Sequence, residues 1–138
     1  MPKPLRTWSM SRTDCLQRAA TAREHLAVAR ERLEVANAEP GPSEMAQVAA
    51  SNAVLAAIAA ADAVCGSTLG ECSGEQDHRT ATALLRRVQG ADELVAKLQR
   101  LLADKTALQY GGYCTDAVAR ASVSRAEALV RALDQHGL

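Results

Sequence analysis

The chain has 138 residues, and 48% of them are hydrophobic, although phenylalanine is absent and aromatic residues make up only 2%. Sixteen basic residues balance sixteen acidic ones, which argues against a dedicated, sequence-independent DNA-binding protein, because such proteins usually carry a basic surplus. This length suits one domain with a real core, and an apolar fraction made of Ala, Leu and Val favours helices over strands. We therefore expect an all-α fold.

Three features of the sequence predict the domain organisation of the protein and its cellular compartment: the N-terminal segment, the cysteines and the apolar runs. Residues 1–10 contain two prolines and predict a flexible arm, disordered or loosely docked, before a single helical domain over residues 11–138. The arm lacks the apolar run of a signal peptide. The four cysteines form no CxxC pair, so we expect neither zinc nor another cofactor. The run 48–65 is diluted by three polar residues, so we expect a cytoplasmic protein with reduced thiols and no membrane partner.

The first predicted helix begins near Ser11, with Ser11 or Thr13 as its cap, and extends to about Asn37. Its apolar residues recur at alternating spacings of four and three, as in a heptad seam. The seam consists of Cys15, Ala19, Ala22, Leu26, Ala29, Leu33 and Ala36. Such a seam usually forms bundle core, and it could also contact a second copy of the chain.

The second predicted helix follows the break "AEPGPSE". It begins after its cap, Ser43, and extends to Gly66 or Leu69. The helix is apolar nearly all round between residues 53 and 64, so we expect it to be the central, buried one. A short third helix over about residues 76–88 comes after the break "GSTLGECSGE".

Two further long helices complete the chain. One covers about residues 91–109, and the other begins near Thr115, after the turn "YGGYCT", and extends to about Gln135. The residues of the last helix that we expect to face inwards are Val118, Ser122, Arg125 or Ala126, Leu129 and Leu133. Short breaks between long helices predict antiparallel neighbours. The expected architecture is an antiparallel up-and-down bundle of four long helices plus one short helix.

Asp62 stands in the middle of the most apolar helix, in "AAIAAADAVCGS". An unpaired carboxylate buried there would cost several kcal/mol, about the desolvation penalty of one ion. The side chain must therefore pair, take up a proton or face a cavity. The candidate partners are Lys105, His78 and Arg79, and the pair would either fix helix register or hold a functional carboxylate in a polar cleft. A solvent-open position is the third alternative.

Asp77 and His78 occupy a predicted helix start in "QDHRTATALLRR". Capping and the helix dipole are sufficient to explain Asp77. His78 is harder to explain in this way, because an imidazole beside two carboxylates could titrate near physiological pH. The two residues are thus either a helix cap or part of a catalytic site.

Lys105, Tyr110 and Tyr113 cluster in "LLADKTALQYGGYC". The two tyrosines, which are the only ones in the chain, are either core or loop anchors with their hydroxyl groups on backbone atoms or part of a ligand-binding edge. In the second case Lys105 supplies charge to a phosphate, and a tyrosine supplies a hydroxyl group or a stacking face.

Three stretches together resemble a bacterial branch of the HEPN superfamily: "AIAAADAVCGSTLGECSGEQDHRTATALL", "LLADKTALQYG" and "RAEALVRAL". The resemblance covers roughly residues 48–134 and lies in helix order, an Ala-rich helix followed by Gly, Asp-His at a helix start, and a Lys-Tyr helix. Members are helical bundles that typically dimerise, and many are RNA-cleaving toxins or partners of minimal nucleotidyltransferases. The resemblance implies a homodimer with RNA, a nucleotide or a nucleotidyltransferase-type protein as partner.

The chain departs from the motif of active members, in which an Arg is followed, after four to six residues, by a His. The matching positions here are Lys105 and Tyr110. Tyrosine, with a free pKa of about 10, is a poor general acid or base at pH 7, and lysine lacks the bidentate fork of arginine. In some toxin members a tyrosine near the motif accepts AMP, and Tyr110 or Tyr113 resembles that acceptor.

Three hypotheses of function follow. The first is a non-catalytic binding or regulatory module of a toxin–antitoxin or defence-type system, which the missing Arg-His pair favours. The second is a divergent metal-independent RNase in which His78 is the general base, Asp77 or Asp62 orients it and Lys105 stabilises phosphate charge. The third is a purely structural dimer. The functional hypotheses place Asp62, His78, Lys105 and Tyr110 around one polar groove.

Overall fold

The computed structural model describes residues 4–74, 78–110 and 112–138, and within these ranges it describes the side chains of all residues except 78 and 106–110. The elements in chain order are β1 (Thr7–Ser9), α1 (Arg12–Ala38), α2 (Glu44–Leu69), β2 (Glu71–Ser73), α3 (His78–Leu85), α4 (Asp92–Tyr110) and α5 (Asp116–Gln135). The predicted bundle of four long helices and one short helix is confirmed.

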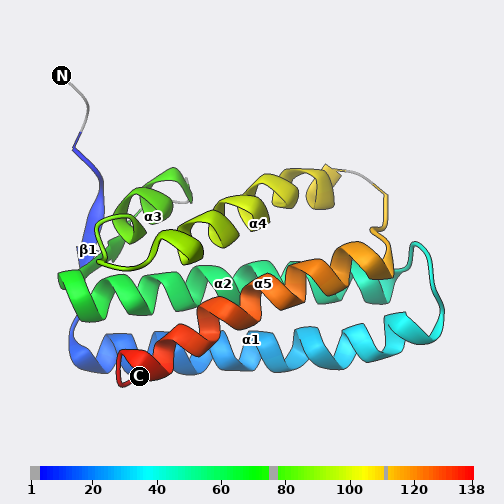
Figure 1. The fold of residues 1–138 in the computed structure, drawn as a ribbon, viewed down its shortest axis with the longest axis horizontal. Coiled ribbons are helices and arrows are strands. Elements are labelled where there is room, and N and C mark those ends of the chain that lie inside the picture. Colours follow the sequence, from blue (N-terminus) through cyan, green and yellow to red (C-terminus); the bar gives the residue numbers. More distant parts are fainter. Residues whose placement is uncertain (1–3, 75–77, 111) are drawn as a thin grey trace.

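The long helices run alternately in opposite directions along the molecule (Figure 1). Helices α1, α2 and α5 pack against one another along their lengths, while α4 contacts α2 and α5 from the opposite side. Helix α3 lies beside β1 at one end of the bundle, whereas α4 ends toward the other. The central position of α2 follows from its contacts with α1, α4 and α5.

Three of the long helices begin at capping hydroxyl groups, of which the sequence predicted Ser43 and, with Thr13 as its alternative, Ser11. The Ser11 hydroxyl accepts from the backbone N–H of Asp14 at 3.1 Å, and the Asp14 carboxylate accepts from the backbone N–H of Ser11 at 2.9 Å. This reciprocal pair satisfies two backbone donors that the helix itself leaves unpaired. The Ser43 hydroxyl caps α2 and the Thr115 hydroxyl caps α5 in the simpler one-bond form.

Small side chains make up most of the core. Ten alanines of α2 are buried, and the heptad seam of α1 is buried as well, except that Leu33 is only partly covered. Alanine lets helix backbones approach closely, so the seam packs inside the chain. In α5, Ser122, Leu129 and Leu133 face inwards as predicted. The prediction for Val118 is wrong, since it is 40% exposed in the first turn of α5.

Helix α2 is long and apolar enough to cross a membrane by those two criteria alone. In the bundle, 72% of its most apolar window is buried inside the chain. The central helix of a helical bundle meets the same criteria, so this feature gives little weight to a membrane location.

A short antiparallel sheet joins the N-terminal segment to the bundle, which the prediction of a flexible arm over residues 1–10 missed. Strand β1 pairs with β2 so that Trp8 lies opposite Cys72. The backbone N–H of Met10 also donates to Gly70 O at 2.9 Å. Three-residue strands are too short for a period of two to be recognised, and the pairing depends on where α2 ends. The sheet carries residues of the N-terminal segment onto the side of α2 that holds Asp62.

Candidate functional site

Asp62 forms an ion pair with Arg18, which lies on the neighbouring helix α1. The Nε and Nη2 atoms of Arg18 both donate to Oδ2 of Asp62, at 3.3 and 2.9 Å. The Asp62 side chain is 12% exposed and that of Arg18 is 38% exposed. The pair thus lies at the boundary between core and solvent, with the carboxylate inside and the guanidinium toward the surface.

Burial changes the acidity of this carboxyl group. Desolvation raises the pKa of Asp62 above its ordinary value, and the hydrogen bonds and charge of Arg18 lower it by a smaller amount. The ionised form is therefore held in place by Arg18 at a position where the surrounding alanines would favour the neutral form.

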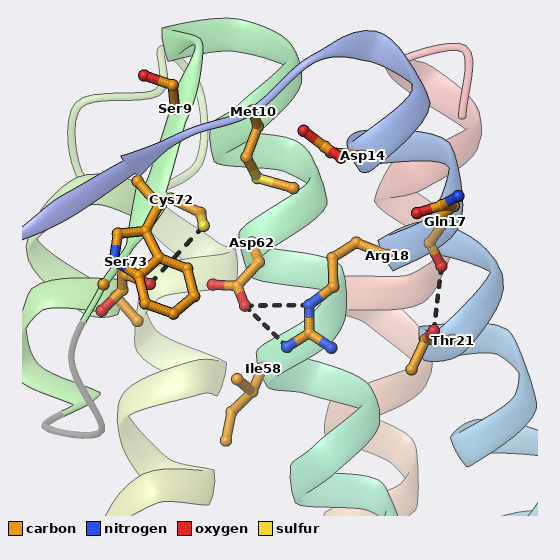
Figure 2. A pocket seen from close by; sticks show the side chains of 13 residues that line it. Ser9, Met10, Asp14, Gln17, Arg18, Thr21, Ile58, Asp62, Cys72 and Ser73 are labelled. Atoms are coloured by element: carbon orange, nitrogen blue, oxygen red, sulfur yellow. Dashed lines mark hydrogen bonds and ion pairs between the residues drawn. The ribbon is translucent and has the colours of Figure 1, made fainter.

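A cavity of about 670 Å³ opens beside the ion pair (Figure 2). A volume of this size is within the range of small-molecule sites. Its walls come from β1, α1, α2, β2 and α3, so it exists only where the short sheet meets the bundle. The lining residues are Trp8, Ser9, Met10, Asp14, Gln17, Arg18, Thr21, Ile58, Asp62, Cys72, Ser73, Gly74 and Ala81.

Trp8 is the only tryptophan in the chain, and it is 68% exposed at the edge of this cavity. A Cβ atom added to Gly74 would lie 2.8 Å from both Cδ1 and Nε1 of Trp8. The indole therefore rests against the backbone of Gly74, which only a glycine permits at this distance. Most of the ring surface stays accessible, which is unusual for such a large apolar side chain.

Three buried thiols lie around the same end of α2. Burial raises the pKa of Cys65 to about 12, and it also raises the pKa values of Cys15 and Cys72. Such thiols are protonated and weakly nucleophilic near neutral pH. Among the described residues, no group of three or more His, Cys, Asp or Glu side chains could hold a metal ion.

The structure brings Asp62 together with Arg18 and Trp8, rather than with Lys105 or Tyr113. Lys105 is half-buried on α4, and Tyr113 is 60% exposed in the connection from α4 to α5. Neither of them lines the cavity. Asp77 lies outside the described residues, as do the side chains of His78, the first residue of α3, and Tyr110, the last residue of α4.

Of the alternatives that the sequence left open for Asp62, the structure shows an ion pair beside a cavity, but its partner, Arg18, was not among the candidates. Arg79, which was one of the predicted partners, is exposed on α3. Arg18 precedes Ala19 of the buried seam, so it stands at the edge of the face that α1 presents to α2. A search for basic residues flanking the seam could have found it. Trp8 could have been noticed as the one tryptophan in an aromatic-poor chain.

No protein-family model matches the chain, and no curated protein matches it significantly. The candidate site therefore depends on its own geometry: a fixed guanidinium, a buried carboxylate and an exposed indole around one open cavity.

Proposed function

We propose that this protein is a non-catalytic RNA- or nucleotide-binding module of the HEPN-like type, acting as a regulatory component of a toxin–antitoxin or defence-type system. The observation that carries the proposal is the cavity beside Arg18 and Asp62 with the exposed Trp8 at its edge. Proteins that bind single-stranded nucleic acids commonly stack bases on aromatic side chains and recognise their polar groups with arginine.

The composition of the lining favours binding over catalysis. Among the described residues, its ionisable side chains are Asp14, Arg18, Asp62 and Cys72, and burial raises the pKa of the Cys72 thiol. Asp14 is engaged in the cap of α1 and Asp62 is engaged by Arg18. A general base takes up the proton that it removes, whereas the hydrogen bonds to Asp14 and Asp62 stabilise each carboxylate in its ionised form. Groups fixed in this way serve recognition better than proton transfer.

The proposal is tested with a fluorescently labelled single-stranded RNA and the 138-residue chain in EDTA. We expect fluorescence anisotropy to rise to saturation, and we expect the RNA to remain intact on a denaturing gel. Arg18→Gln is expected to weaken binding, while Arg30→Gln, which removes an exposed pair with Glu127 on α5, leaves binding unchanged. An anisotropy that stays flat contradicts the proposal. Cleavage that His78→Ala abolishes would instead establish the divergent RNase.

The proposal includes a homodimer. Val28 and Val35 on α1, and Val48 and Leu55 on α2, are exposed apolar side chains. Each pair is seven residues apart and so lies on one side of its helix. Light scattering is expected to give about twice the 14.6 kDa mass of one chain, and Leu55→Gln is expected to shift the protein toward the monomer. A monomer mass for the unmodified protein at high concentration would show that these side chains are not an interface.

A further inference from the structure

We infer that the cavity takes the base of a nucleotide, stacked on Trp8 and read along its polar edge by the Arg18–Asp62 pair, with the phosphate outside. This inference rests on the proposed binding of RNA or a nucleotide and assigns the part of that ligand which enters the protein.

The ion pair offers both a donor and an acceptor side by side. Two of the five N–H groups of Arg18 are used by Oδ2 of Asp62. The remaining guanidinium hydrogens and the second carboxylate oxygen, Oδ1, form no hydrogen bond with the part of the chain that the structure describes. The mutual contact fixes both side chains, so a ligand meets a rigid edge that donates at one point and accepts at the next.

The charge of the lining disfavours a phosphate in the cavity. Arg18 contributes one positive charge, and Asp14 and Asp62 contribute two negative ones. The guanidinium is already neutralised by the nearer carboxylate, at 2.9 Å. An anion that reached Arg18 would also be repelled by the carboxylates of Asp62 and Asp14 in the same lining. A neutral ligand with a donor beside an acceptor has no such penalty.

The other walls suit a flat, apolar ring. Figure 2 shows Met10 and Ile58 on either side of the Asp62–Arg18 pair, so apolar surface flanks the polar edge. Trp8 adds an exposed aromatic face at the cavity edge, and Gly74 supports the ring from behind by close contact. Stacking on an indole tolerates every base, because each has a π-face.

Nucleobases carry the matching edge. Cytosine, adenine and guanine each place an N–H donor next to a ring-nitrogen or carbonyl acceptor. The donor would face Oδ1 of Asp62, and the acceptor would face the free N–H groups of Arg18. Purine riboside has the same ring system as adenosine but lacks the exocyclic amino group, so it keeps the stacking surface and loses the donor. It is the matched control ligand.

Trp8 also supplies the measurement, since its fluorescence is the tryptophan signal of the whole chain. Titration with adenosine, guanosine or cytidine is expected to quench this fluorescence to saturation. Purine riboside is expected to bind at least about 10-fold more weakly, because it offers no N–H donor to Oδ1 of Asp62. Inorganic phosphate is expected to cause no change, and a nucleoside triphosphate is expected to bind no more tightly than its nucleoside.

Variants separate the ion pair from the indole. Arg18→Gln and Asp62→Asn are each expected to weaken nucleoside binding about 10-fold or more, and Arg30→Gln is expected to leave it unchanged. Trp8→Ala changes an exposed residue and should fold. In calorimetry it is expected to lose at least about 10-fold in affinity, whereas Trp8→Phe keeps part of the stacking.

Three results would overturn the inference: quenching by phosphate, equal binding of purine riboside and adenosine, or no quenching by any nucleoside. If RNA still raises the anisotropy of the preceding experiment while nucleosides leave Trp8 unchanged, only the base assignment fails and the proposed function stands. If neither RNA nor nucleosides bind, both fail.

Discussion

At the scale of single residues, the contact between Asp62 and Arg18 links the stability of the bundle to its cavity. Arg18→Gln removes the guanidinium and leaves the carboxylate of Asp62, 12% exposed, without its partner. We expect a loss of about 1–2 kcal/mol in the free energy of unfolding, less than for a fully buried pair because water reaches this one. Urea denaturation at pH 7 measures this loss. The control, Asp134→Asn, breaks a pair in which the aspartate is 78% exposed and should cost less than about 0.5 kcal/mol.

The same carboxyl group gives stability a dependence on pH. Because the pKa of Asp62 is raised in the folded protein, the folded state takes up a proton at higher pH than the unfolded chain. Its contribution to stability is full below the unfolded pKa, near 3.8, and is lost as the pH rises through the folded pKa. The free energy of unfolding of the unmodified protein, minus that of Asp62→Asn, should therefore decrease from pH 4 to pH 7. A difference that grows with pH would mean that attraction to Arg18 outweighs desolvation.

Gly66 permits a close contact between α2 and the start of α1. A Cβ atom there would lie 2.6 Å from Met10 Sδ and 2.7 Å from Cys15 Sγ. Met10 is flexible, but Cys15 is 2% exposed and has no room to move. We expect Gly66→Ala to destabilise the protein by about 1–2 kcal/mol, because overpacking outweighs the gain in helix propensity. Ser67→Ala changes the exposed neighbour on the same helix and should be neutral or slightly stabilising. Equal melting temperatures for the two variants would contradict the close contact.

At the scale of elements, the start of α2 depends on one hydroxyl group. Ser43 Oγ accepts from the backbone N–H of Ala46 at 3.1 Å. Ser43→Ala should cost about 1 kcal/mol in stability, as is typical for the loss of a helix cap. Ser124→Ala makes the same chemical change on the exposed side of α5 and should be neutral or stabilising. Thermal denaturation followed by circular dichroism compares the two, and an unchanged midpoint for Ser43→Ala would show that the cap is dispensable.

The helices could be predicted because their signals are local. Ser11, Ser43 and Thr115 stand before the helices that they cap, and prolines or glycines separate the apolar runs. The pairing of β1 with β2 has no such signal, because three residues show no period and their partner is more than sixty positions away. The prediction for Val118 failed because the four-residue spacing to Ser122 does not show how far a buried face extends toward the end of a helix.

At the scale of the whole molecule, the candidate site depends on how separate segments meet. The cost of an unpaired charge in an apolar helix was enough to predict that Asp62 pairs, takes up a proton or faces a cavity. The identity of its partner depends on the rotation of α1 about its axis against α2, which the spacing of the seam fixes only roughly. The cavity needs the short sheet as well, so a sequence analysis without β1 and β2 could not place Trp8 beside Arg18.

The reactivity of the four thiols measures how readily the helices of the bundle separate. Cys114 is partly exposed in the connection before α5, whereas Cys15, Cys65 and Cys72 are buried. With a pKa of about 12, Cys65 is almost wholly protonated at pH 8. We expect an aromatic disulfide reagent at that pH to modify one thiol quickly and three slowly, and Cys114→Ser should remove the fast phase. The slow phase should accelerate with urea in parallel with unfolding, because Cys65 reacts only when α2 separates from its neighbours. Fast reaction of all four thiols in the absence of urea would show that the helices part far more readily than their packing implies.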